Sequence, residues 1–295
     1  MTRVAAVDLG TNSTRLLVAD VDGEHVTEVV RRSVVTRLGE GVDARRRLLP
    51  VPIARVRNVL ADYRRELESL GAERTLVVAT SAVRDAENGE AFLGEIEWSY
   101  GFRTRLLSGD EEAELTRRGV GTLAAATLLL DVGGGSTELS AGEFRQSYDI
   151  GSVRLTERFL AGDPPQPDEL AAAAEAVRAL LPELVVSDAL GVAGTVGQLA
   201  ALVGTDTLTL PAVELQLERL AALPLAERRT LPGLDPDRAP VIVAGCLIVR
   251  EVLRRYNLEA IRFSVRDILD GAALEAAAMP AAAEGDIPPG AFTCC

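Results

Sequence analysis

One nine-residue pattern occurs twice in the chain, and it constrains the fold more than any other feature. The segments Asp8 to Leu16 and Asp131 to Leu139 both have the pattern D-x-G-x-x-S-T-x-L, so five positions match. Each copy follows a short apolar run, Val4 to Val7 in the first case and Thr127 to Leu130 in the second. Two unrelated hairpins with glycine turns are the alternative, but the equivalent context favours duplication of a whole lobe, with a period far longer than that of a solenoid.

The periodicity of apolar residues predicts strands that alternate with helices in both halves of the chain. The predicted strands cover residues 4–7, 15–20, 25–32, 74–80, 103–107, 127–130, 143–148 and 261–265, and residues 189–195 are predicted to be a strand followed by a glycine turn. The longer predicted helices cover residues 52–70, 90–100, 110–119, 168–181, 211–223, 240–256 and 268–279. This order indicates a mixed α/β architecture. We place the two lobes at residues 1–124 and 125–279, and we predict a disordered Ala/Pro/Gly-rich tail at residues 280–295.

Charge and composition exclude several classes of chemistry. The net charge is −13 and every basic residue is arginine, which excludes a P-loop lysine and a Schiff-base lysine. An acidic chain is also a poor general binder of nucleic acid. The only histidine, His25, lies in a predicted hairpin turn, so we expect no histidine-based catalysis.

The cysteines and the hydrophobic pattern indicate a cytoplasmic protein. Cys246 lies in an apolar run and is predicted to be an inert core residue, whereas the role of Cys294 and Cys295 stays open. The three cysteines form neither a disulfide framework nor a zinc spacing. No apolar run approaches the ~20 residues of a membrane span, and the N-terminus lacks the regions of a signal peptide.

The glycine-rich turn of the second copy is a candidate phosphate site. Three glycines, Gly133 to Gly135, allow backbone N–H groups to point at one spot, with Ser136 as a further donor. Asp131 at the end of the preceding strand offers a hard oxygen ligand for Mg²⁺. Asp8 has the same position in the first copy, so each lobe offers one such aspartate.

At this point the chain resembles the exopolyphosphatase / guanosine pentaphosphate phosphatase (Ppx/GppA) family. The resemblance rests on five segments in the family order: Val7 to Ser13, Ala79 to Ala86, Ser108 to Ala113, Asp131 to Glu138, and Gly151 to Glu157. It extends from Arg3 to about Leu274 and is closest to the short actinobacterial type, which lacks the C-terminal helical module. It implies an actin-like ATPase (ASKHA, ribonuclease H-like) fold, in which two duplicated lobes surround a central cleft.

The resemblance also implies roles for individual residues. Glu112 matches the general base, Glu138 is implied as a catalytic residue, and Asp8, Asp131 and Glu138 are implied as the metal ligands. The implied metal is Mg²⁺, with Mn²⁺ as the alternative. The expected substrate-binding residues are Asn12, Ser13, Ser81, Arg84, Gly133, Gly134, Gly135, Ser136, Arg154, Gly194 and Thr195.

Several of these positions have alternative explanations. Glu111 is the main rival of Glu112 as the base, because both could be ordinary first-turn acids of one helix. Arg84 and its neighbour Asp85 could form a local ion pair. Three consecutive arginines, Arg45 to Arg47, are most simply a solvated loop, although a polyanion could use them. Ala193 stands where many family members have glycine, which puts the Gly194–Thr195 contact in doubt.

The function implied by the resemblance is metal-dependent hydrolysis of terminal phosphate from inorganic polyphosphate. Guanosine pentaphosphate (pppGpp) 5′-phosphohydrolysis is the alternative within the family, and a phosphate- or nucleotide-binding sensor with little turnover is the alternative of another class. An actin-like sugar kinase is disfavoured by the glutamate pair, since a kinase must exclude water as nucleophile. The expected partners are therefore polyphosphate or pppGpp, without nucleic acid or membrane. From the resemblance alone, we expect a homodimer.

Overall fold

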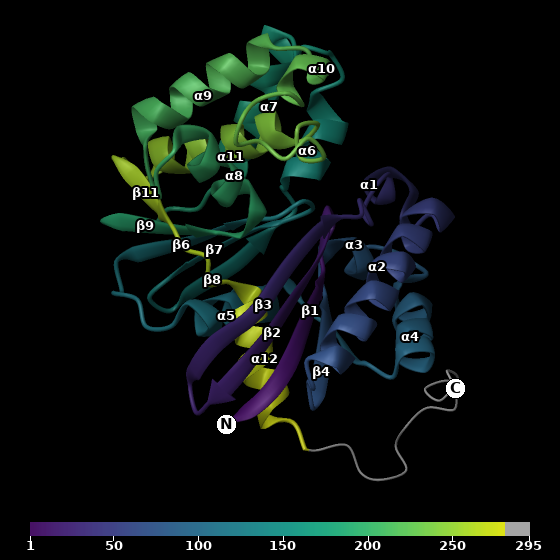
Figure 1. Cartoon of the computed structure of the whole chain (residues 1–295). Helices are drawn as coiled ribbons and strands as arrows, with labels where there is room; N and C mark the ends of the chain where they lie inside the picture. The colour runs from purple at the N-terminus through teal and green to yellow at the C-terminus, as the bar shows by residue number, and fades with distance from the viewer. Residues whose placement is uncertain (281–295) are drawn as a thin grey trace. The chain divides into compact units, whose positions relative to one another are not determined.

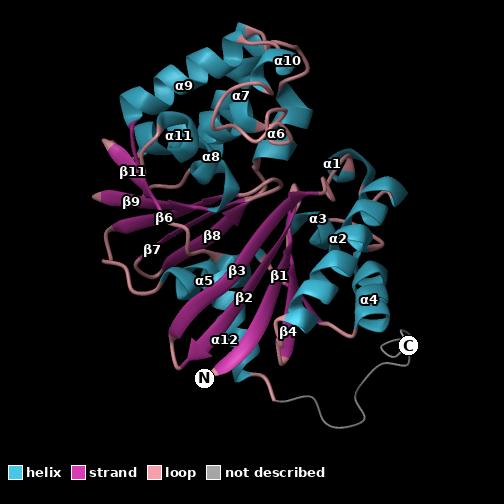
Figure 2. Cartoon of the chain, in the orientation of Figure 1, coloured by secondary structure: helices cyan, strands magenta, loops and turns pink. Residues whose placement is uncertain are grey.

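The computed structural model describes residues 1–280 and divides the chain into two compact units. Unit 1 comprises Met1–Val120 and the segment that begins at Ile268, whereas unit 2 comprises Gly121–Asp267. Figures 1 and 2 show helices on both faces of the sheet in unit 1, whereas the helices of unit 2 lie on one side of its sheet. Each unit is described by itself below.

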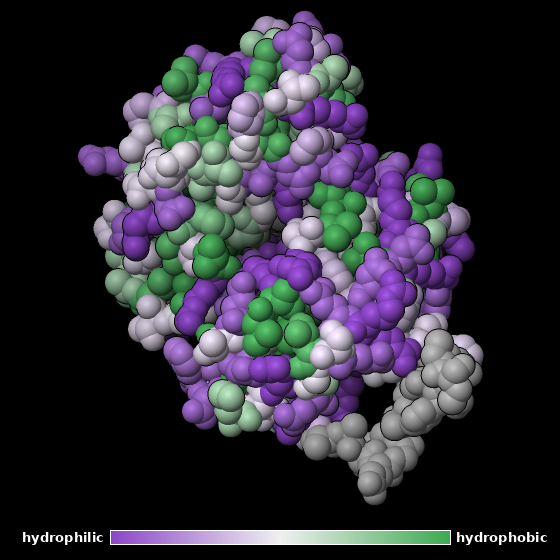
Figure 3. Space-filling model, in the orientation of Figure 1, coloured by the Kyte–Doolittle hydropathy of each residue, from purple (hydrophilic) through white to green (hydrophobic). Residues whose placement is uncertain are grey.

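Unit 1 contains a five-stranded mixed sheet with the order β3-β2-β1-β4-β5. Its strands are β1 (Thr2–Leu9), β2 (Ser13–Asp22), β3 (His25–Val35), β4 (Arg74–Ala79) and β5 (Arg103–Leu106). The first three strands form an antiparallel meander, whereas β4 pairs in parallel with both β1 and β5. On the edge strand β3, Val29 and Val34 are exposed, and Figure 3 shows hydrophobic atoms among hydrophilic ones over this strand.

Helices cover both faces of this sheet because its strands have apolar side chains on both sides. The helices of unit 1 are α1 (Val42–Arg45), α2 (Pro50–Ser69), α3 (Ser81–Arg84), α4 (Gly89–Tyr100), α5 (Gly109–Val120) and α12 (Ile268–Ala278). One buried cluster joins the sheet to α2 and α4 through residues such as Leu60 and Ile96. A second cluster joins the opposite face to α5 and α12 through residues such as Leu115 and Leu269.

Helix α12 differs from the predicted domain boundaries. The sequence analysis assigned residues 125–279 to the second lobe, but α12 packs against β1 and α5 of unit 1. Gly271 permits this contact, because an added Cβ would lie 2.0 Å from the carbonyl oxygen of Leu115. Two ion pairs, Arg31–Asp270 at 2.9 Å and Arg105–Glu275 at 2.5 Å, further attach α12 to unit 1. The boundary at which the chain first passes from unit 1 to unit 2 also lies after Val120 rather than after residue 124.

Substitution of Gly271 by alanine is expected to lower the free energy of unfolding by about 1–3 kcal/mol, because the added methyl group overpacks the α5–α12 contact. Gly94, in the exposed part of α4, is the matched control, because nothing lies within 4 Å of the Cβ it would gain. Gly94→Ala should instead stabilise the chain by up to about 1 kcal/mol through helix propensity. Urea denaturation of both variants measures the two signs, and equal effects would contradict the close contact.

Unit 2 contains a six-stranded mixed sheet with the order β10-β11-β9-β6-β7-β8. Its strands are β6 (Thr127–Val132), β7 (Thr137–Ala141), β8 (Phe144–Tyr148), β9 (Asp188–Val192), β10 (Thr207–Thr209) and β11 (Ala260–Phe263). Strands β6, β7 and β8 are antiparallel neighbours, whereas β9 is parallel to both β6 and β11. The short edge strand β10 was not predicted, since its three residues carry too weak a pattern.

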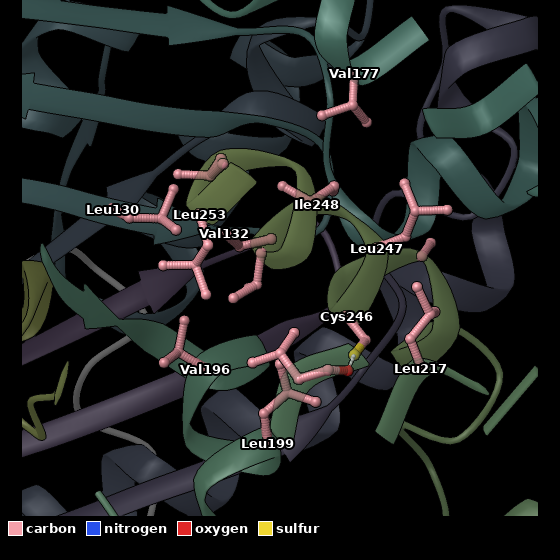
Figure 4. Close-up of a cluster of buried hydrophobic side chains, with 14 of the residues drawn as sticks. Leu130, Val132, Val177, Val196, Leu199, Leu217, Cys246, Leu247, Ile248 and Leu253 are labelled. Atoms are coloured by element: carbon pink, nitrogen blue, oxygen red, sulfur yellow. Dashed lines mark hydrogen bonds between the residues drawn. The ribbon is translucent and has the colours of Figure 1, made fainter. Parts of the chain in front are cut away.

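The core of unit 2 forms around α11. Its helices are α6 (Ser152–Phe159), α7 (Pro167–Leu180), α8 (Ala193–Val203), α9 (Leu210–Ala222), α10 (Leu225–Arg228) and α11 (Ile242–Arg255). Figure 4 shows side chains of β6, α7, α8 and α9 around Cys246, Leu247 and Ile248 of α11, all of which are buried. Complete burial raises the pKa of the Cys246 thiol to about 12, which agrees with its predicted role as an inert core residue.

The two units repeat one topology, as the duplicated pattern predicted. In order, β1, β2, β3, β4 and β5 correspond to β6, β7, β8, β9 and β11. The turn is also the same, because Gly10 N donates to Ser13 O at 3.0 Å and Gly133 N donates to Ser136 O at 3.0 Å. The predicted duplicated α/β fold is confirmed.

Two other predictions concern the ends of the chain and its helices. The predicted disordered tail at 280–295, with Cys294 and Cys295, lies outside the described residues except for Pro280. Among residues 1–280, no helix is long and apolar enough to cross a membrane.

Candidate active site

In unit 1, the first copy of the pattern lies at the carboxyl end of β1. Asp8 is buried, and its Oδ2 accepts hydrogen bonds from Arg15 Nε at 2.9 Å and Nη2 at 2.7 Å. The two residues are cross-strand partners in the β1–β2 ladder. The implied metal ligand of this unit is therefore already bound to a guanidinium, which neutralises its charge.

Asn12 and Ser13 form the turn that follows Asp8, and both are buried. The carbonyl oxygen of Asn12 accepts hydrogen bonds from the N–H groups of Thr36 at 3.0 Å and Arg37 at 2.9 Å. Arg37 has a φ of 50°, a left-handed conformation that is uncommon outside glycine. The loop after β3 therefore fixes the conformation of this turn.

Ser81 and Arg84 follow the carboxyl end of β4, which is parallel to β1 and ends at the same edge of the sheet. Ser81 is buried, and its Oγ lies 3.5 Å from Asp85 Oδ2. Asn12, Ser13 and Ser81 thus lie at one edge of this sheet.

Arg84 contacts the predicted base rather than forming only a local ion pair. Its Nη1 donates to Glu112 Oε2 at 3.2 Å and to the carbonyl oxygen of Leu107 at 2.8 Å. Glu112 lies in the first turn of α5 and is buried, with 8% of its surface exposed. A guanidinium and a carboxylate from two separate motifs therefore meet in unit 1.

Glu111, the alternative candidate for the base, forms hydrogen bonds with Ser108 and Arg105 instead. Its Oε2 accepts from Ser108 N at 2.8 Å, and its own N–H donates to Ser108 Oγ at 3.3 Å, which is the reciprocal pattern of a capping box. Its Oε1 also binds Arg105 at 2.7 Å. These hydrogen bonds, first that from the Ser108 backbone and then that from Arg105, lower the pKa of Glu111 to about 2. A carboxylate with so low a pKa is a weak proton acceptor.

A pH dependence of stability follows from this capping carboxylate. The pKa of Glu111 falls from 4.5 to about 2 on folding. Its stabilising contribution is therefore complete above about pH 4.5 and is lost as the pH falls toward 2. Wild type and Glu111→Gln should differ most in free energy of unfolding at neutral pH and converge between pH 4.5 and 2. Urea denaturation across this range measures the difference, and a gap that stays constant with pH would contradict the assignment.

In unit 2, two buried carboxylates lie directly opposite each other. Asp131 and Glu138 are cross-strand partners in the β6–β7 ladder, with 7% and 3% of their surfaces exposed. Side chains in such pairs are neighbours on one face of the sheet, and like charges there destabilise the fold. Glu138 Oε1 accepts a hydrogen bond from Ser147 Oγ at 2.6 Å. The equivalent position in unit 1 is Arg15, so only unit 2 places two carboxylates together.

This pair fits the metal that the resemblance implied. Mg²⁺ is commonly held by one or two carboxylates together with water and substrate phosphate oxygens. Within residues 1–280, no group of three or more His, Cys, Asp or Glu residues is close enough to hold a metal ion. The Asp131–Glu138 pair matches the preference of this ion, whereas Asp8 is paired with Arg15.

The glycine turn of unit 2 is held by the first turn of α6. The carbonyl oxygen of Gly134 accepts from Val153 N at 2.8 Å and from Arg154 N at 3.1 Å. Gly151 lies so close to this turn that an added Cβ would be 2.3 Å from the Gly134 carbonyl carbon. The turn is therefore rigid, and its carbonyl groups point toward α6.

The N–H groups of the same turn have a different arrangement. Among the described residues 1–280, the N–H groups of Gly134, Gly135 and Ser136 have no hydrogen-bond acceptor. Arg154 is buried, and its Nε donates to Gly135 O at 2.8 Å. Three consecutive N–H groups without a protein acceptor, beside a buried guanidinium, are the donor arrangement typical of an anion-binding turn.

Gly194 and Thr195 lie at the start of α8, next to the end of β6. Thr195 Oγ1 donates to Val132 O at 2.8 Å, and the side chain is buried. Ala193, which stands where many family members have glycine, has a φ of 62°. This left-handed conformation is one that glycine adopts more readily than alanine. An added Cβ on Gly194 would lie 2.0 Å from Arg238 Nη1, so this glycine leaves space for a guanidinium.

Arg238 was missed by the sequence analysis. It lies in the loop before α11, and its side chain is mostly buried, with 14% exposed. No spacing in the sequence connects this arginine to Gly194, because the contact joins segments that are far apart along the chain. Its position adds a second guanidinium to the edge of the sheet that carries Asp131.

Comparison with known proteins identifies the family of the chain. A model of the Ppx/GppA phosphatase family matches residues 17–277. The chain belongs to this family. The match confirms the resemblance inferred from the five motifs, and the chain is accordingly a hydrolase with the actin-like ATPase fold.

Individual members of the Ppx/GppA family match almost the whole chain. Exopolyphosphatase 2 of Mycobacterium tuberculosis is 38% identical, over 94% of this chain and 99% of that protein. The crystal structure of an exopolyphosphatase-like protein has 31% identity and a TM-score of 0.86, covering 93% of this chain and 97% of that chain. The Aquifex aeolicus PPX-GPPA enzyme has 27% identity and a TM-score of 0.76, with coverages of 93% and 99%.

Proposed function

We propose that the chain is an exopolyphosphatase that hydrolyses the terminal phosphate of inorganic polyphosphate. The observation that carries the proposal is the buried Glu112 carboxylate held 3.2 Å from the Arg84 guanidinium in unit 1. Such a pair combines a proton acceptor for water with a cation for phosphate oxygens. The name of the relative in Mycobacterium tuberculosis, Exopolyphosphatase 2, supports the same substrate class.

In the proposed reaction, the oxygen of a water molecule attacks the terminal phosphorus and the bond to the bridging oxygen breaks. The water proton passes to Glu112, and the leaving chain is one phosphate shorter. Phosphoryl transfer to water depends on positioning and charge neutralisation more than on covalent work by the protein. Glu112 is proposed as the base in preference to Glu111, because Glu111 is used by the capping box and by Arg105.

Each unit by itself offers donors that fit phosphate oxygens. In unit 1, Arg84 is the proposed phosphate contact, together with Asn12, Ser13 and Ser81. In unit 2, the proposed contacts are the N–H groups of Gly134, Gly135 and Ser136, together with Arg154. Preorganised donors of this kind commonly supply a large part of a rate enhancement.

We propose that Asp131 and Glu138 hold Mg²⁺, with Mn²⁺ as an alternative. Their side chains are buried neighbours, and no arginine is their cross-strand partner. A bound divalent ion would neutralise phosphate charge and remove the repulsion between the two carboxylates. Asp8 was also an implied ligand, but its contact with Arg15 favours a role in fixing the first turn.

The test is phosphate release by the wild-type chain from tripolyphosphate, long-chain polyphosphate and pppGpp, with Mg²⁺ and with a chelator. Fastest turnover of polyphosphate that stops on chelation would support the proposal. Fastest turnover of pppGpp would replace polyphosphate by the nucleotide as the substrate. Binding of these ligands without phosphate release would favour the sensor and reject the enzyme assignment.

A further inference from the structure

Three consecutive arginines, Arg45 to Arg47, form an exposed basic segment in unit 1. They lie at the end of α1 and in the loop that follows it, and all three are exposed. The sequence analysis left open whether this loop is merely solvated. In a chain with a net charge of −13, a polyanionic substrate needs a local concentration of positive charge.

This basic segment is attached to the residues that directly follow Arg84. The carbonyl oxygen of Arg46 accepts a hydrogen bond from Glu87 N at 2.8 Å. Arg46 Nη1 also lies 4.0 Å from Asp85 Oδ1. Figure 1 shows α1 and α3, which carry Arg45 and Arg84, at the same end of unit 1.

A second contact, between Leu48 and Asn88, attaches the same segment to the residues that follow Arg84. Leu48 N donates to Asn88 Oδ1 at 2.8 Å, and Asn88 Nδ2 donates back to Leu48 O at 3.1 Å. Arg46 itself has a φ of 52°, and this left-handed residue reverses the chain direction at the end of α1. The backbone of the segment is therefore held in place on both sides of Arg46, so that little order must be created when a ligand binds.

The charges of this segment are also less neutralised than those of nearby arginines. Within residues 1–280, neither Arg45 nor Arg47 has an ion-pair partner. On α2 of the same unit, by contrast, Arg55 and Arg57 each contact a glutamate at 2.6 Å. Arg45 and Arg47 therefore present guanidinium groups to solvent without an intervening carboxylate.

We propose that Arg45, Arg46 and Arg47 bind phosphate groups of long-chain polyphosphate beyond those that Arg84 contacts. The proposal rests on the proposed function, since it extends the phosphate-binding residues of unit 1. Guanidinium groups match phosphate oxygens in geometry and remain charged at any physiological pH. A long chain carries more phosphates than Arg84 alone can bind, so we expect the segment to add affinity for long chains.

The test compares wild type with Arg45→Gln/Arg46→Gln/Arg47→Gln by isothermal titration with tripolyphosphate and with long-chain polyphosphate. The variant is expected to bind the long chain roughly tenfold more weakly and tripolyphosphate equally well. The slope of log affinity against log salt concentration for the long chain should also fall by about 2, since up to three phosphate contacts are lost. The KM for phosphate release from each substrate provides a second measurement.

The matched control changes the same charge elsewhere in unit 1. The variant Arg57→Gln/Arg65→Gln/Arg103→Gln removes three exposed arginines, two from α2 and one from the start of β5. Arg103 lies at the end of the sheet opposite to the one that Arg84 follows. This control should bind both ligands as the wild type does, apart from a small effect of net charge.

Each outcome separates this inference from the proposed function. If the two triple variants bind long chains equally well, the inference is rejected, although wild-type turnover would still support an exopolyphosphatase. If the test variant loses affinity for both ligands equally, discrimination by chain length is rejected. If wild type releases no phosphate but the test variant alone binds long chains weakly, the binding segment stands and the proposed function fails.

Discussion

Replacing Glu112 by glutamine is expected to lower the rate constant for phosphate release by about 10²–10⁴-fold, the usual contribution of a positioned general base. Glutamine preserves the shape of the side chain and can still accept a hydrogen bond from Arg84, but it cannot accept the water proton. The KM should change much less than kcat, since Arg84 and its bond to Leu107 O remain. Steady-state kinetics with the preferred substrate and Mg²⁺ measures both constants.

The control for this prediction is the adjacent Glu111→Gln variant. Glu111 has 44% of its side chain exposed and binds Ser108 and Arg105, so its loss should weaken the cap of α5 and leave most of the turnover. Circular dichroism and thermal unfolding confirm that both variants fold. If Glu111→Gln is the inactive variant and Glu112→Gln retains wild-type kcat, the assignment of the base is wrong.

Replacing Asp131 by asparagine is expected to reduce turnover by about 10²-fold or more, because it removes one of two adjacent carboxylates and so weakens metal binding by several kcal/mol. Asparagine keeps the size of the side chain, so the β6–β7 ladder should persist. The variant should also bind Mn²⁺ more weakly when titrated without substrate and followed by electron paramagnetic resonance. This second measurement does not depend on catalysis.

Asp188→Asn is the matched control for the proposed metal site. Asp188 begins β9 at the opposite end of the same sheet, where it accepts a hydrogen bond from Thr127 Oγ1 at 3.2 Å. Its loss removes the same charge from unit 2 and should leave Mn²⁺ affinity and turnover near wild type. Equal losses in the two variants would indicate an effect of net charge and not of coordination.

The duplicated fold was predictable because its signals are local. Each copy of the pattern joins an apolar strand to a glycine turn, and strand pairing then follows from the two-residue alternation of buried side chains. The equal turn hydrogen bonds at Gly10 and Gly133 show how little the two copies differ in backbone structure. They differ in chemistry at one position of the second strand, Arg15 or Glu138, and in the turn, where unit 2 has Gly134 and Gly135 in place of Thr11 and Asn12.

The assignment of α12 was not predictable from local signals. The apolar pattern predicted a helix from residue 268, and the structure has one, but the choice of the sheet against which it packs depends on contacts between distant residues. Gly271 meets Leu115, and Arg31 meets Asp270, across more than 150 positions of sequence. The position of α12 along the chain suggested that it belongs to the second lobe. Its packing against β1 and α5 places it in unit 1 instead.

The candidate site was predictable where its residues belong to a recognisable sequence motif. Arg84 and Glu112 were identified separately, and the structure shows that they contact each other. One available signal was overlooked, since Ser108 and Glu111 have the S-x-x-E spacing of a capping box, which would have separated Glu111 from Glu112. Arg238 had no such signal, because only the folded chain places it over Gly194.

The discontinuous composition of unit 1 also sets the order in which the chain can fold during synthesis. Residues 121–267 form a complete unit, with all its strands, before α12 leaves the ribosome. Unit 1 begins earlier but keeps one apolar face of its sheet uncovered until Leu269 and the rest of α12 emerge. Although domains commonly complete their folding from the N-terminus onward, the second unit is here expected to finish first. The first unit therefore cannot close its core until α12 has been synthesised.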